Sequence, residues 1–310
     1  MHIRTFIIAA AATLLLAGCA PKHTTSSQSA TRTVTTTAGK TQIPAHPKRV
    51  VSTVYTGELL SLGVPVVGST QMDLQNPWLS KSATKGIKDL GNAMNQEAIL
   101  KLKPDLIVTS NEADVKKLKA IAPVLYIPYG STGDMYQTLT TFGTWFGKTA
   151  QAKTVAADLK ATAKTAVTQL KAGGIDPAVT TVSFFDIQAS KLYVDGATWG
   201  RGGNAIVTAM GFKLNAASQK VEVGTGYKQI STESLTTYAG DWMFFSNTTT
   251  TANGNDQAIS DLKHNAVWQQ LPAVKAGHVV ALPFTKMYYY DPAAIKGQIK
   301  LVAKTMLKQQ

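Results

Sequence analysis

Catalytic side chains do not gather into a recognisable motif in this chain. The sequence has no Gly-x-Ser-x-Gly nucleophile elbow, no phosphate-binding Gly-x4-Gly-Lys-Ser/Thr loop and no His-Glu-x-x-His zinc helix. A glycine-rich segment at residues 200–204 precedes an expected helix, where it could bind an anion or simply form a tight turn. It does not meet the dinucleotide-binding pattern. We therefore predict that the protein is not an enzyme.

The histidines are too scattered to predict a metal site. Three of the five, His46, His264 and His278, fall in the expected folded part, in separate loop contexts and at no metal-ligand spacing. A receptor for a bare metal ion would need several convergent histidine and carboxylate ligands. We expect these histidines to be exposed to solvent, and we predict neither a metal site nor a cofactor.

Aromatic side chains in polar loops are better candidates for ligand binding. Core packing explains most single aromatics, but those in glycine-containing loops near strand ends are harder to assign to a core. Several of them facing one cleft would form a wide apolar pocket with a few polar groups. The residues concerned are Tyr55, Trp78, Tyr129, Tyr193, Trp199 and Tyr288.

The single cysteine, Cys19, follows a short apolar run that begins after Arg4. A basic start, an apolar stretch too short to span a membrane and small residues at its end are typical of a secretory signal. Residues 16–19, Leu-Ala-Gly-Cys, resemble a bacterial lipobox, in which the cysteine is acylated. An ordinary secreted protein with a stray cysteine is the alternative. We predict an extracytoplasmic protein that is anchored to the cell membrane by lipid at Cys19.

Composition and charge limit the remaining possibilities. Residues 19–45 are rich in threonine and serine, so we expect a flexible tether, with folded structure beginning near Pro47. Removal of residues 1–18 takes away only Arg4 and lowers the net charge from +13 to +12. The lysines are scattered and form no arginine-rich stripe, which argues against nucleic acid as a partner.

The order of expected elements predicts two α/β lobes that are bridged by a single long helix. Strands and helices alternate before residue 146 and again after residue 172, as in sheets with helices on their faces. In the second part, Val179–Ile187 and Lys191–Val194 are expected to be paired strands. Between them, apolar residues recur at helical spacing without glycine or proline until Gly173. We expect a signal peptide at 1–18, the lipidated tether at 19–45, an N-terminal lobe at 46–145, the bridging helix at 146–172 and a C-terminal lobe at 173–310.

Several segments then resemble one known family. The runs are Pro47–Val51, Glu58–Val64 and Glu97–Val108 in the first lobe, and Ile230–Glu233, Asp241–Phe245 and Trp268–Gly277 in the second. They are similar to the ferric-siderophore substrate-binding lipoproteins of ABC importers, over residues 45–305. This resemblance implies the same two-lobed fold, no catalytic activity, and delivery of cargo to a membrane permease by a monomer.

The resemblance also implies roles for individual residues. By motif position, Glu97 and Glu233 would each present a carboxylate to arginines of the permease, one from each lobe. Tyr193, Trp199 and Arg201 resemble the Tyr…Trp-x-Arg arrangement of Gram-positive ferric-hydroxamate receptors, in which the arginine bonds oxygens around iron. Iron would therefore enter only as a siderophore complex. Tyr55, Trp78, Tyr129 and Tyr288 are placed in the pocket by loop position alone.

The alternatives differ in ligand or in class of protein. A tris-hydroxamate of Fe³⁺ is about neutral and needs one guanidinium, whereas a tris-catecholate carries about three negative charges and needs several cations. Lys81, Lys85 and Lys286 could supply these cations if their side chains point into the cleft, so a catecholate ligand stays an alternative. A haem or corrinoid receptor on the same scaffold is another alternative, and haem would need an axial ligand such as Met72, Met287 or Tyr288. A lipoprotein enzyme or adhesin is the alternative from another class.

Overall fold

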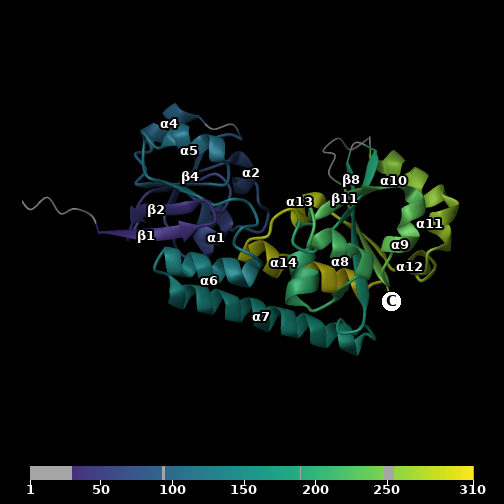
Figure 1. Cartoon of the computed structure of the whole chain (residues 1–310). Coiled ribbons are helices and arrows are strands. Elements are labelled where there is room, and N and C mark those ends of the chain that lie inside the picture. Colours follow the sequence, from purple (N-terminus) through teal and green to yellow (C-terminus); the bar gives the residue numbers. More distant parts are fainter. Residues whose placement is uncertain (1–29, 93–94, 189, 248–254, 310) are drawn as a thin grey trace, which may run out of the picture.

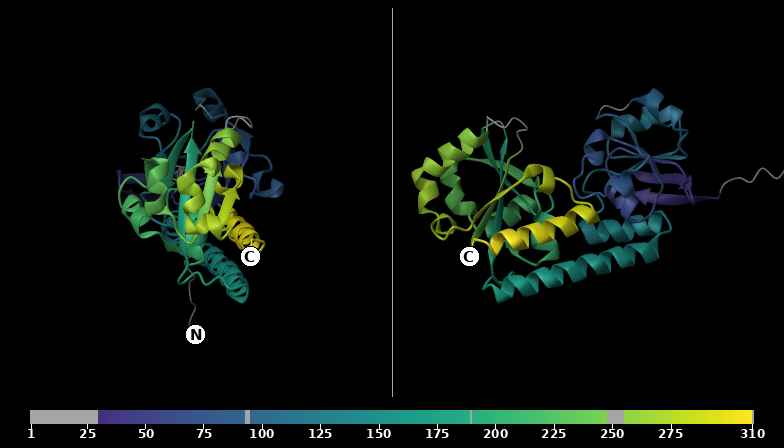
Figure 2. Two further views of the ribbon diagram at one scale, coloured as in Figure 1. Left: turned by 90° about the vertical axis from the view of Figure 1, so that its right-hand side faces the viewer. Right: turned by 180° about the vertical axis from the view of Figure 1, so that it is seen from behind.

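The computed structural model describes residues 30–92, 95–188, 190–247 and 255–309. It contains two α/β lobes above one long helix, α7, which runs beneath both of them (Figure 1). Figure 2 shows the same arrangement from behind, with α14 lying alongside α7. The expected signal peptide and Cys19 lie outside the described residues. The two-lobed α/β architecture expected from the sequence is confirmed.

The N-terminal lobe is built on a parallel sheet of five strands in the order β5-β4-β3-β6-β7. Its central strands are buried on both faces, which explains their uninterrupted β-branched and leucine residues. Helices cover the sheet and connect its strands. The strands are β3 Val50–Ser52, β4 Val66–Ser69, β5 Lys88–Asp89, β6 Leu106–Thr109 and β7 Val124–Tyr126. The helices are α1 Thr56–Ser61, α2 Gln71–Leu74, α3 Lys81–Thr84, α4 Gln96–Lys101, α5 Glu112–Leu118 and α6 Met135–Trp145.

The predicted tether is wrong for residues 31–44, which form an antiparallel hairpin of β1 (Thr31–Thr36) and β2 (Gly39–Pro44). Val34 and Ile43 lie on one face of it and are buried in the core of the lobe. Threonine favours strands, and a two-residue alternation needs only these two apolar side chains to hold the hairpin on the fold. Folded structure therefore begins before Pro47.

The bridging helix is α7, Thr149–Ala172. Gly174, with φ +83°, adopts a left-handed conformation just beyond its end, so the predicted stop at the glycine pair is confirmed. The helix begins three residues later than expected, because Gly147 (φ +65°) turns the chain after α6 and the two helices pack against each other. Among the described helices, none, α7 included, is both long and apolar enough to span a membrane.

The C-terminal lobe contains a mixed sheet in the order β11-β9-β8-β12-β13, with the short β10 beside β8. The predicted pairing of β8 with β9 is confirmed and is antiparallel, whereas β12 and β13 run parallel to β8. The strands are β8 Thr181–Gln188, β9 Lys191–Asp195, β10 Lys213–Leu214, β11 Tyr227–Ile230, β12 Trp242–Asn247 and β13 Val279–Leu282.

Short helices surround this sheet, and the last helix returns to the lobe junction. A π-helix, η1 (Asn204–Ala209), packs against both α7 and α14. The others are α8 Ala216–Glu222, the 3-10 helix η2 Thr232–Ser234, α9 Leu235–Tyr238, α10 Asn255–His264, α11 Ala266–Gln270, α12 Pro272–Lys275, α13 Phe284–Met287 and α14 Pro292–Met306.

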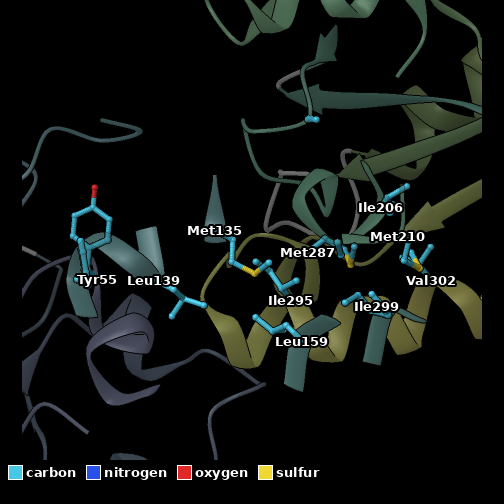
Figure 3. Packing of buried hydrophobic residues seen from close by; sticks show 14 of the residues in the cluster. Tyr55, Met135, Leu139, Leu159, Ile206, Met210, Met287, Ile295, Ile299 and Val302 are labelled. Atoms are coloured by element: carbon cyan, nitrogen blue, oxygen red, sulfur yellow. The ribbon is translucent and has the colours of Figure 1, made fainter. Parts of the chain in front are cut away.

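One hydrophobic core extends through both lobes. Met135 and Leu139 on α6 belong to the same buried cluster as Ile206 and Met210 on η1. Figure 3 shows how α14 connects them, with Ile295 and its neighbours between α7 and the C-terminal lobe. The lobes are therefore joined by shared packing as well as by the bridging helix.

Residues 72–78 of the N-terminal lobe form hydrogen bonds with residues 286–291. Asn76 Nδ2 donates to Asp291 Oδ2 at 2.6 Å, and Trp78 Nε1 donates to the Lys286 carbonyl at 2.7 Å. The Tyr289 hydroxyl donates to the Met72 carbonyl at 2.8 Å. We call these contacts the lobe junction. The Trp78 ring also covers Gly297 of α14, where a Cβ atom would lie 2.0 Å from ring atom Cε3.

Gly297→Ala tests this packing. Alanine inside a helix is normally more stable than glycine by about 1 kcal/mol, so propensity alone predicts a higher Tm. The clash with Trp78 opposes this gain, and we expect Gly297→Ala to lower the Tm. In a Trp78→Ala background the clash is absent, so the same substitution should raise the Tm. Thermal unfolding of the four proteins, followed by circular dichroism, measures both changes. A higher Tm for Gly297→Ala alone would contradict the packing.

Candidate ligand-binding cleft

A cavity of about 530 Å³ opens between the two lobes. One wall comes from residues 129–139 of the N-terminal lobe, with Tyr55 and Glu58 behind them. The opposite wall comes from the loop at 198–204 and the turn at 222–226 of the C-terminal lobe. A site at the carboxyl ends of strands from two lobes is a favoured place for a ligand.

A chain of aromatic rings crosses this cavity. Tyr129 of the N-terminal lobe meets Trp199 of the C-terminal lobe edge to face, with ring centroids 6.4 Å apart. Tyr129 also meets Tyr290 at 5.5 Å, and Trp199 lies 4.5 Å from Tyr227. Tyr193 on β9 continues the chain, with its ring 6.3 Å from that of Tyr227. The structure thus places Tyr129 and Trp199 on the cavity wall, whereas Tyr193 reaches them only through Tyr227 and does not line the cavity.

Arg201 lies on the same loop as Trp199 and is held from beneath. Its Nε and Nη2 atoms both bond Oδ2 of Asp186 on β8, at 2.8 and 2.6 Å. The guanidinium also lies over the Phe284 ring, 5.0 Å from its centroid. Arg201 is only 9% exposed, and it adopts φ +55°, which is unusual for a side-chain-bearing residue. Such a conformation at a candidate site points to a functional constraint.

A second buried carboxylate accompanies this ion pair. Burial raises the pKa of Asp186, although the Arg201 charge opposes the shift. Burial, and then the charge of Asp186, raise the pKa of Asp195 on β9 to about 7. Neither oxygen of Asp195 has a hydrogen-bond partner. Asp195 therefore carries a full negative charge only above neutral pH, and Asp186, which is bonded to Arg201, is the main counter-charge of that guanidinium.

The glycine-rich segment at residues 200–204 forms a tight turn and is not an anion cradle. Gly200 and Gly202 adopt φ +112° and +87° on either side of Arg201. A Cβ at Gly202 would lie 2.1 Å from Cε of Met287, so the chain passes too close for a larger residue. These glycines place Arg201 over β8.

The other aromatics predicted for the pocket lie in different surroundings. Tyr55 lines the cavity but is 2% exposed, packs edge to face on Phe142, and has its pKa raised by burial. Trp78 belongs to the lobe junction and does not line this cavity. Tyr288 lines a smaller recess of about 50 Å³ beside it.

That recess contains a group of carboxyl side chains that the sequence did not single out. Burial raises the pKa of Asp73 to about 6, and burial also raises the pKa values of Glu58 and Asp291. The charge of Asp291 adds to the shift at Glu58. Asp291 caps α14 by accepting from the Ala293 and Ala294 amides, and it accepts from Asn76. An acidic residue directly before a proline-initiated helix is the only sequence signal for this cap.

Metal-binding groups do not converge in the described part of the chain. No three histidine, cysteine, aspartate or glutamate side chains there are arranged to hold an ion. His46 and His264 are exposed, as expected. His278 is half-buried instead, because its ring stacks on Trp242 with centroids 4.2 Å apart.

The two glutamates predicted for permease docking lie on different lobes. Glu97 is exposed in the first turn of α4, and Glu233 is exposed in η2. Figure 1 places α4 at the end of the N-terminal lobe that is remote from α7. Neither residue lines the cavity.

Comparisons with known proteins agree with this architecture. Residues 51–285 match the model of the family described as periplasmic binding protein. The chain is 36% identical to the iron(3+)-hydroxamate-binding protein YxeB of Bacillus subtilis over 279 residues, which covers 90% of this chain and 86% of that protein. It is 31% identical to the iron(3+)-hydroxamate-binding protein FhuD of the same organism, over 87% of this chain and 84% of FhuD.

One solved structure shares the fold of this chain. FhuD2 from Staphylococcus aureus with bound ferrioxamine B superimposes with a TM-score of 0.72 at 29% identity, covering 85% of this chain and 99% of FhuD2. The family match covers most of the chain, and both the fold and the interlobe cavity are consistent with it. The chain belongs to the periplasmic binding protein family.

Proposed function

We propose that the protein is an extracytoplasmic receptor that binds a ferric siderophore of the hydroxamate type and delivers it to an ABC permease. The observation that carries this proposal is the interlobe cavity, with aromatic walls from both lobes. Arg201 follows Trp199 on the same loop but does not itself line the cavity. Its relatives YxeB and FhuD bear the name of iron(3+)-hydroxamate-binding proteins, which supports the ligand class. Binding and release require no covalent chemistry, so the protein acts as a carrier and not as an enzyme.

The charge of the site supports a neutral complex. Arg201 uses Nε and Nη2 to bond Asp186, which leaves Nη1 to donate to an oxygen around the iron. A tris-hydroxamate of Fe³⁺ is about neutral, so its hydrocarbon backbone can pack on the rings of Tyr129 and Trp199 without an unpaired charge. Lys81, Lys85 and Lys286 are exposed and do not line the cavity, so a catecholate would lack its cations there.

The haem alternative loses its candidate axial ligands. Met287 is fully buried beneath Gly202, and Met72 is 44% exposed at the lobe junction. Tyr288 lines the small recess and not the main cavity. A metal centre at the cavity would therefore lack a ligand from these three residues.

We also propose that Cys19 carries the lipid anchor and that Glu97 and Glu233 meet the permease. The anchor is supported by the Leu-Ala-Gly-Cys run and by the fact that folded structure begins at Thr31. The docking role is supported by the exposure of both glutamates on separate lobes, away from the cavity. The protein would act as a monomer, with one lobe against each half of the permease.

Arg201→Ala should weaken ferric-hydroxamate binding at least tenfold, or about 1.4 kcal/mol, because a charge-assisted bond to the ligand is lost. The same change leaves Asp186 buried without its cation and should also lower the Tm. Arg201→Ala combined with Asp186→Asn separates the two effects. Its Tm should recover while its affinity stays low. Trp199→Ala should lower the affinity by a comparable factor.

Fluorescence titration and thermal unfolding of these variants provide the measurement, because four of the five tryptophans remain in Trp199→Ala. Lys191→Ala, which removes one exposed positive charge from the same lobe, is the control. Unchanged affinity in the Arg201→Ala protein for every hydroxamate tested would exclude Arg201 from the binding site.

Cys19→Ser should release the protein from the membrane fraction and leave ligand affinity unchanged, because the thiol that would be acylated precedes, in the sequence, every residue that lines the cavity. Membrane fractionation and a binding titration of the released protein measure the two outcomes. Serine keeps the size of the side chain but cannot form the thioether. Retention of the variant in the membrane fraction would disprove the lipid anchor.

Glu97→Ala combined with Glu233→Ala should abolish uptake of iron from a hydroxamate while the purified receptor keeps its affinity, because these charges act only on docking. Each single variant should retain partial uptake, since the other lobe still pairs. Uptake of labelled iron by cells and titration of the purified proteins test this. A loss of affinity in the double variant would place the glutamates in the pocket or the fold instead.

A further inference from the structure

The cavity between the lobes is rich in hydrogen-bond acceptors and poor in positive charge. Among the described residues that line it, Glu58, Asp134 and Glu222 are acidic, and none is lysine, arginine or histidine. The charged side chains of the lining are thus all acidic, whereas the chain as a whole has a net charge of +13.

Glu222 is the carboxyl group most suited to meet a ligand. It is half-buried on the wall opposite Tyr129, and its oxygens accept from the Thr198 amide at 3.1 and 3.2 Å and from the Thr198 hydroxyl at 2.5 Å. These bonds use donors of one neutral residue. None of the ion pairs between described residues includes Glu222. Its position is thus fixed while its charge has no counter-ion.

Asn204 adds no second accessible acceptor to this wall. Its Oδ1 atom has no hydrogen-bond partner, but that atom is itself buried, so it is not the part of the residue that meets the cavity. The preference for a ligand that donates therefore rests on the Glu222 carboxylate.

The other charges around the cavity do not offset this preference. Burial and the charge of Asp291 raise the pKa of Glu58, which favours its neutral form, and Asp134 is occupied as the cap of α6. The positive charge of Arg201 is opposed by Asp186 directly beneath it. An anionic complex would enter without a free cation and would meet Glu222.

We infer that Glu222 is a specificity-determining residue that favours ferric hydroxamates bearing a free ammonium group over uncharged or carboxylate-bearing ones. The inference rests on the proposed function, because it assumes that a hydroxamate occupies this cavity. In this arrangement the iron centre lies against the aromatic rings, and the ammonium group donates to the Glu222 carboxylate. The receptor thus distinguishes one ferric hydroxamate from another by the charge of the terminal group of the ligand, and not by its iron centre.

Three forms of one ligand test this on the intact protein. Ferrioxamine B ends in a primary ammonium, its N-acetyl derivative is uncharged at that end, and its N-succinyl derivative ends in a carboxylate. The parent protein should bind them in that order of affinity, with the ammonium form favoured over the acetyl form by about threefold to tenfold, since the pair is partly exposed to solvent. This preference should shrink as the salt concentration rises.

Glu222→Gln is the matched variant, because the amide oxygen can still accept from Thr198. We expect it to bind the ammonium and acetyl forms equally, whereas Glu112→Gln, which removes an exposed charge of α5, should keep the parent's preference. Equal binding of the three forms by the parent, or an unchanged preference in Glu222→Gln, would overturn the inference. Failure of the parent to bind any form would overturn the proposed function as well. The salt series on the parent tests the charge effect even if Glu222→Gln does not fold.

Discussion

The hydrophobic core shared by the two lobes is the constraint on which the rest of the structure depends. α14 contacts α1 of the N-terminal lobe, α7 beneath it and η1 of the C-terminal lobe, so no lobe can move without disturbing buried packing. The junction around Trp78 and Asn76 adds polar contacts to the same helix. A cleft between lobes held in this way is largely preformed, and a ligand does not have to order it. We therefore expect lobe movement on binding to be small.

The buried ion pair of Arg201 and Asp186 serves to orient the guanidinium group more than to stabilise the fold. Desolvation costs several kcal/mol per buried ion, and apolar residues of similar size often serve stability equally well. Holding Arg201 at φ +55° between two glycines adds a further cost of about 1–3 kcal/mol. A guanidinium bonded by Asp186 through Nε and Nη2 has a fixed orientation and keeps Nη1 unpaired with any described residue. The ion pair is therefore better explained by ligand recognition than by a contribution to the stability of the fold.

The sequence predicts elements with long periodic patterns better than it predicts contacts across the chain. The bridging helix and its glycine stop follow from spacing alone, and so does the pairing of β8 with β9. The hairpin was missed because only Val34 and Ile43 reveal it within a threonine-rich stretch. The Asp134…Gln137 capping box is a local signal for α6. Trp78 and Glu222 have no such signal, because their surroundings are made by residues more than 20 positions away.

The early start of the fold at β1 has a consequence for how far the receptor could travel. Only residues 20–30 separate Cys19 from the hairpin, and covalent geometry limits a chain of that length to roughly 40 Å. Arg32, which donates to the carbonyls of Thr144 and Trp145, fastens that entry point to the end of α6. If Cys19 carries a lipid anchor, so short a connection would confine the receptor to a thin layer above the membrane, and its encounter with a permease would be governed by local concentration in that layer.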